Sequence, residues 1–64
     1  MTLSEVMKMT RAWPKDKTIP QKLAAAINQA KEEDKEKMGF LIEGLYVDCN
    51  SDKDFELIKK YFGD

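Results

Sequence analysis

The amino-acid sequence contains no histidine and a single cysteine, Cys49. Without histidine, the Ser-His and Cys-His pairs that activate many catalytic nucleophiles cannot form, and the usual zinc and copper sites lose their main ligands. A lone cysteine cannot make an internal disulfide, which makes a reducing cytoplasm the simplest location. We therefore expect a non-enzymatic cytoplasmic protein that holds no metal or other cofactor.

Long hydrophobic runs, glycine and proline are also scarce. No apolar run approaches the roughly 18 residues that cross a bilayer, and the N-terminal stretch lacks the charged, apolar and small segments of a signal peptide. Three glycines and two prolines, with 42% hydrophobic and 36% charged residues, are typical of a folded helical domain. We expect residues 1–64 to form one domain, not in a membrane and too small for a deep, enclosed active site.

Charge is abundant, and its two signs are unevenly distributed. Residues 1–31 carry six basic side chains against two acids, a net charge of +4, while residues 32–64 carry five lysines against ten acids, a net charge of −5. The segment KEEDKEK, residues 31–37, contains no apolar residue. It is either an exposed helical stretch or a turn capped by Asp34, and its charges suit a solvent-exposed face or a docking strip for a basic partner.

Apolar residues recur with helical spacing in several segments, and no segment of useful length alternates as a half-buried strand does. The sequence predicts an all-α bundle of three or four helices, over residues 3–11, 19–32, 35–48 and 52–62. Thr2 and Glu5 have the spacing of a capping box at the start of the first helix, which must end before Pro14. The second helix is preceded by a similar start signal, made of Thr18, Pro20 and Gln21.

The predicted helix over residues 35–48 is apolar on two sides. One face consists of Met38, Leu41, Ile42 and Leu45, and a second face, roughly opposite, consists of Phe40, Gly44 and Val47. Glycines at 39 and 44 each weaken a helix by about 1 kcal/mol relative to alanine, which predicts close packing of another backbone there. We expect Phe40 and Val47 to be buried mainly within the domain, because so short a chain has little core to spare. The alternative is that they contact a partner.

The stretch DCNSDKDFE, residues 48–56, has part of the pattern of a calcium-binding loop. An EF-hand loop needs oxygen ligands at alternate positions, a glycine at its sixth position and a bidentate glutamate at its twelfth. Counting from Asp48, these two positions hold Lys53 and Lys59, which supply neither the turn nor the ligand. We therefore interpret the stretch as a helix start capped by Ser51 or Asp52, without a metal.

The basic N-terminal region is one candidate binding surface. Its candidate nucleic-acid contacts are Lys8, Arg11, Lys15, Lys17 and Lys22. Trp13 lies among them and would stack on a base, or alternatively would fold back to cover the small core. The overall net charge of −1 and the presence of only one arginine argue against direct contact with DNA or RNA.

An apolar surface is the other candidate binding surface. The chain has more apolar side chains than a minimal bundle buries, and this surplus must contact something. The candidate partner residues are Trp13, Phe40, Val47, Leu57 and Tyr61. We expect a small helical protein that acts through protein-protein contact, as a regulator, inhibitor or assembly factor, with another protein or a second copy as its partner. The alternative function is a nucleic-acid-associated regulator that uses the basic region.

Overall fold

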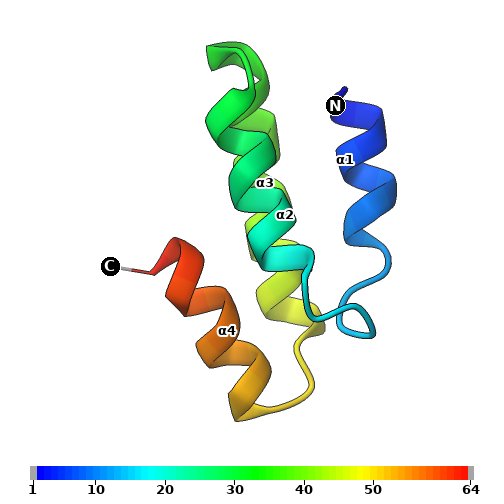
Figure 1. The fold of residues 1–64 in the computed structure, drawn as a ribbon, viewed down its shortest axis with the longest axis vertical. Helices are drawn as coiled ribbons and strands as arrows, with labels where there is room; N and C mark the ends of the chain where they lie inside the picture. The colour runs from blue at the N-terminus through cyan, green and yellow to red at the C-terminus, as the bar shows by residue number, and fades with distance from the viewer. Residues whose placement is uncertain (1, 64) are drawn as a thin grey trace.

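The computed structural model describes residues 2–63, which form four helices (Figure 1). They are α1 (Leu3–Thr10), α2 (Ile19–Gln29), α3 (Glu32–Asp48) and α4 (Asp52–Phe62). The described part of the chain contains no strand. The prediction of a small all-α bundle is therefore confirmed, and the number of helices is four.

The two middle helices, α2 and α3, form an antiparallel hairpin, and α1 and α4 lie on either side of it (Figure 1). Both middle helices contact both outer helices, whereas α1 and α4 do not pack against each other. The loop over residues 11–18 connects α1 to α2 at the end of the hairpin where α3 finishes. The core therefore lies between the hairpin and its two flanking helices.

The junction between α2 and α3 differs from the prediction. The helices are separated by Ala30 and Lys31, whose backbones are extended. The expected bounds of 19–32 and 35–48 are therefore wrong here, because the break comes earlier and α3 begins earlier. The first turn of α3 is rich in carboxylates, which complement the positive end of the helix dipole; they are Glu32, Glu33 and Asp34. Segment 31–37 thus belongs almost entirely to α3.

Hydrogen bonds at the helix starts confirm one predicted cap and correct another. The Glu5 N–H donates to the Thr2 hydroxyl at 3.2 Å, and the Thr2 N–H donates to the Glu5 carboxylate at 3.0 Å, so the capping box is present. Pro20 stands in the first turn of α2, as expected. The Thr18 hydroxyl does not cap α2. Because the Thr18 backbone is already close to helical, its hydroxyl donates instead to the Asp16 carboxylate at 2.6 Å.

The core contains buried apolar side chains from all four helices and from the loop before α2. They are Val6, Trp13, Ile19, Leu23, Met38, Leu45 and Ile58. Met38 and Leu45 are buried, and Leu41 and Ile42 are half-buried against the core. The predicted inward face of α3 is therefore confirmed.

Trp13 joins the loop over residues 11–18 to the end of α3. Its side chain is 4% exposed, and its indole N–H donates to the Leu45 carbonyl at 3.0 Å. That carbonyl lies in the last turn of α3, where carbonyl groups lack a donor from within the helix. Trp13 therefore supplies both apolar area and a hydrogen bond. The prediction that Trp13 belongs to a partner surface or stacks on a base is wrong, and its alternative role in covering the core is confirmed.

Replacing Trp13 should destabilise the protein far more than replacing Phe40. Trp13→Phe leaves the Leu45 carbonyl without its donor and should lower the free energy of unfolding by about 1–3 kcal/mol. Trp13→Ala should lower it by about 3–5 kcal/mol. Phe40→Ala, at a side chain that is 70% exposed, should change it by no more than about 0.5 kcal/mol. Chemical denaturation measures these differences, and equal losses for Trp13→Phe and Phe40→Ala would contradict this packing.

Candidate functional site

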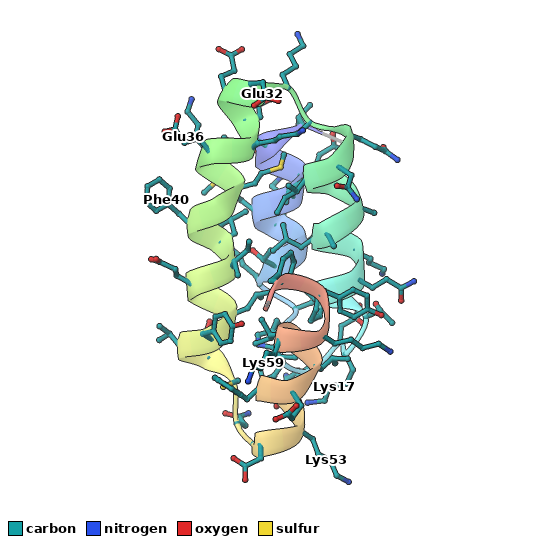
Figure 2. The ribbon with its side chains drawn as sticks, turned by 90° about the vertical axis from the view of Figure 1, so that its left-hand side faces the viewer. Lys17, Glu32, Glu36, Phe40, Lys53 and Lys59 are labelled. Carbon is teal, nitrogen blue, oxygen red and sulfur yellow. The ribbon has the colours of Figure 1, made fainter. Side chains whose placement is uncertain are left out.

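Phe40, Gly44 and Val47 form the outer face of α3, which is directed away from the core. The Phe40 and Val47 side chains are 70% and 83% exposed, and Gly44 is also exposed. Figure 2 shows the Phe40 ring projecting outward from α3. The prediction that this face is buried mainly within the domain is therefore wrong. The buried residues of α3 lie on its other side, toward α1, α2 and α4, so no helix is left to cover the outer face.

The two glycines of α3 do not mark close packing of another backbone. A Cβ atom added at Gly39 or Gly44 would meet nothing within 4 Å, so the contact predicted at these positions is absent from the described chain. At about 100° per residue, Gly44 lies about 40° around the helix from Phe40, and Gly39 lies about 100° from it. Gly44 therefore leaves an open notch in the outer face, while Gly39 lies to one side.

A shallow groove lies beside Phe40, between α3 and the end of α1. Its volume is about 160 Å³. It is lined by Thr10, Arg11, Phe40, Leu41, Gly44, Leu45 and Asp48. Arg11 and Asp48 contribute charges of opposite sign, and the other lining residues are uncharged. An apolar space of about 150 Å³ can hold a benzene-sized group, so the groove has room for one apolar side chain next to the Phe40 ring.

Glutamates lie at one end of the outer face and along one of its borders. Glu33, Glu36 and Glu43 are exposed and lie on the same side of α3 as Phe40, with Lys37 at the edge. The Glu36 and Phe40 side chains project from the same side of the helix in Figure 2. None of the four charged residues forms an ion pair within residues 2–63. The outer face is thus apolar in its middle and negatively charged along the border away from the groove, where Glu36 and Glu43 lie.

The other predicted partner residues lie on α4. Leu57 is half-buried against the core, and the Tyr61 side chain is 36% exposed. Phe55 is a further exposed aromatic residue that the sequence did not assign to a surface; it is 44% exposed and contacts Tyr46, with ring centroids 5.3 Å apart. The five predicted partner residues are therefore divided. Two share the outer face of α3, two lie on α4, and Trp13 is in the core.

The predicted nucleic-acid contacts are divided between internal ion pairs and solvent. Lys17 Nζ lies 2.7 Å from an Asp54 carboxylate oxygen, and Lys22 Nζ lies 3.6 Å from an Asp16 carboxylate oxygen. The exposed residues that form no ion pair within residues 2–63 are Lys8, Arg11 and Lys15. Because Trp13 is buried, it does not provide the stacking ring expected beside these three residues; the exposed ring next to Arg11 is Phe40, which lines the same groove.

The stretch DCNSDKDFE forms the start of α4, as predicted. Ser51 is the N-cap, and its hydroxyl accepts the Asp54 N–H at 3.2 Å. Asp54 is buried; one carboxylate oxygen accepts from Lys17 Nζ, and the other accepts from the Asn50 N–H at 3.3 Å. Asp54 therefore ties the loop that carries Lys17 to the start of α4. In residues 2–63, no group of three or more acidic or cysteine side chains is placed to hold a metal ion.

Comparisons with known proteins assign no function to this surface. The chain matches no protein-family model, no curated protein and no solved structure. In the part of the chain that the structure describes, no helix is both long and apolar enough to cross a membrane. Candidate sites therefore rest on the geometry of the chain itself, in which the outer face of α3 combines exposed apolar side chains with open space beside them.

Acid should weaken the contacts of Asp54. The hydrogen bond from the Lys17 ammonium, aided by those from Asn50 and Ser51, holds the pKa of Asp54 below its ordinary value despite burial. A carboxyl group with a lowered folded-state pKa contributes stability above its unfolded-state pKa of about 3.9, and this contribution is lost as the pH falls through the folded-state pKa. The melting temperature should therefore fall below about pH 4.

Asp54→Asn should have a shallower decline in melting temperature over the same acid range, because it cannot titrate at this position. Asp48→Asn, which changes an exposed carboxyl group, is the matched control. Melting curves of the wild type and both variants between about pH 2 and pH 6 cover the range in which this contribution is lost. A decline in Asp54→Asn as steep as in the wild type would show that the Lys17–Asp54 contact contributes little to acid sensitivity.

Proposed function

We propose that this chain is a small non-enzymatic protein that binds another protein through the outer face of α3, as a regulator, inhibitor or assembly factor. The observation that carries this function is the exposure of Phe40 and Val47 on a helix whose other side already fills the core. Exposed apolar residues on one helix face are typical anchors for a partner. We place the protein in the cytoplasm, because a single cysteine, Cys49, suits a reducing compartment.

Gly44 supports the same function. A glycine within a helix lowers its stability, and no other group in the described chain uses the space that Gly44 opens. A partner that approaches the α3 backbone closely would use that space. The missing side chain at Gly44 would then both lower the stability of α3 and let a partner approach its backbone.

The titratable groups give no support to catalysis. The pKa values of Glu5, Asp16 and Asp54 are all lowered, and hydrogen bonds to the carboxylates are the largest cause in each case. These bonds hold a helix cap, a turn and an ion pair respectively. A general acid working near neutral pH needs a raised pKa, so these shifts have structural roles.

A nucleic-acid-associated regulator remains the alternative function, and the geometry favours it less. Lys17 and Lys22 are paired with carboxylates. Non-specific binding to nucleic acid grows with the number of phosphates that are neutralised. The three remaining cations of the basic region would therefore give only weak, salt-sensitive binding.

Gly44→Ala should stabilise the free protein and weaken its binding to a partner. Because the added methyl group has open space around it, the free energy of unfolding should rise by about 0.5–1 kcal/mol. Gly39→Ala has equally open surroundings and is the matched control. It should stabilise the protein similarly but affect binding less, because it lies farther around the helix from Phe40. A loss of stability in Gly44→Ala on denaturation would contradict the open surroundings.

Photocrosslinking in the source cells tests the function itself. A photoreactive phenylalanine analogue at position 40 should form a light-dependent adduct with another protein, and nuclease should leave the adduct intact. The same analogue at Lys53, near the start of α4 in Figure 2, is the control. The adduct at position 40 should decrease in the Gly44→Ala background and decrease less in Gly39→Ala. Equal adducts at both positions, or an adduct that nuclease removes, would overturn the proposed function.

A further inference from the structure

We infer that the partner presents a basic amphipathic helix to the outer face of α3. This inference rests on the proposed function and specifies the chemistry of the partner segment. The segment would carry apolar residues along one side, to contact Phe40, Val47 and the groove beside them, and lysine or arginine residues along the border that meets Glu36 and Glu43. Three features favour such a helix: the shape of the outer face, its charges, and the symmetry that a contact between two copies would need.

The shape of the outer face suits a helix. Phe40 and Val47 are seven residues apart, about two turns of α3, so their side chains stand in one row. Between them, Gly44 leaves the backbone of α3 open. Helices pack by placing the side-chain rows of one helix into the grooves of the other, and a glycine at the contact lets the two axes approach closely. One apolar side chain of such a helix would enter the groove of about 160 Å³ beside Phe40.

Charge determines which residues should flank the apolar row. On the side of the groove, Arg11 and Asp48 offset each other. Glu33, Glu36 and Glu43, together with Lys37, give the outer face a net charge of −2, and Glu36 and Glu43 both lie on the border away from the groove. No ion pair within residues 2–63 neutralises these four side chains. Complementary charges around an interface speed association, and like charges exclude wrong partners. A partner helix with a basic border against Glu36 and Glu43 therefore fits, and one with an acidic border there is repelled.

A second copy of the chain fits this face less well. Two antiparallel α3 helices related by a two-fold axis would bring like borders together, so Glu36 and Glu43 of one copy would lie near those of the other, which is a repulsive arrangement. The surface of α4 in another copy carries Lys53, Glu56, Lys59 and Lys60 around Leu57, a net charge of +2. Leu57, however, is half-buried against the core, so this surface offers no exposed apolar row to Phe40 and Val47. A contact between α3 of one copy and α4 of another closes a dimer only if it is made twice about a two-fold axis, and otherwise it produces rings or open chains. We therefore favour a different protein.

A display library of helix-forming peptides tests the inference on the full chain. Each peptide has about 18 residues, or five turns, with a fixed apolar row and flanking positions that vary freely between basic, neutral and acidic residues. Selection on the wild-type protein should enrich peptides with basic flanks. Their binding should shift the amide signals of residues 33–47 in NMR spectra, and added salt should weaken it.

Charge-reversal variants then test whether the glutamates select the peptide. Glu36→Lys should weaken binding of the enriched peptides about three- to tenfold, because it replaces attraction at the border by repulsion. Glu56→Lys makes the same change in net charge on α4 and is the matched control, with an expected change of less than about twofold. Phe40→Ala should weaken binding more than Glu36→Lys does, because it removes the central anchor.

The outcomes separate the inference from the proposed function. Enrichment of neutral or acidic peptides on the outer face would overturn the inference and leave the proposed function standing. Selected peptides that all bind elsewhere would overturn the docking site, and photocrosslinking at position 40 would show whether the proposed function fails as well. Sedimentation that reveals self-association lost in Phe40→Ala would identify a second copy as the occupant and also overturn the inference.

Discussion

The hydrogen bond from the Trp13 indole to the last turn of α3 ties the loop over residues 11–18 to the second half of the chain. The loop that carries Trp13 has no helix or strand of its own, yet it contributes a large aromatic residue to the core. Four residues later, Lys17 reaches Asp54 at the start of α4. The loop over residues 11–18 therefore contacts both sides of the corner between α3 and α4, and fixes that corner against α1 and α2.

This arrangement explains why α3 carries apolar residues that do not take part in the core. Trp13 fills the space at the end of the hairpin, and Met38 and Leu45 provide the fully buried contacts of α3. Phe40 and Val47 are not needed to complete the core, because removing an exposed side chain usually changes stability little. We propose that they contact a partner outside the chain. The same exposed row, with its glutamate border, is the basis for the chemistry that we assign to the partner.

Much of the fold could be predicted from local signals, because those signals act within a few residues. The capping box of Thr2 and Glu5 and the helix start at Ser51 are such cases. The break at residues 30–31 could not be placed, because Gln29, Ala30, Lys31 and Glu32 are all residues that favour a helix. The roles of Trp13 and Phe40 could not be separated either. Helical spacing shows which residues share a face, but which face is covered depends on contacts between residues far apart in the sequence, such as Trp13 with Leu45.

The relative solvent accessibility of Trp13 and Phe40, measured in one sample, tests this division of aromatic residues most directly. A neutral paramagnetic agent broadens the NMR signals of protons that it can approach. We expect the ring signals of Phe40 to broaden strongly at agent concentrations that leave the indole N–H signal of Trp13 nearly unchanged. Equal broadening of the two residues, or stronger broadening at Trp13, would contradict a core closed by Trp13 and an outer face of α3 left free for a partner.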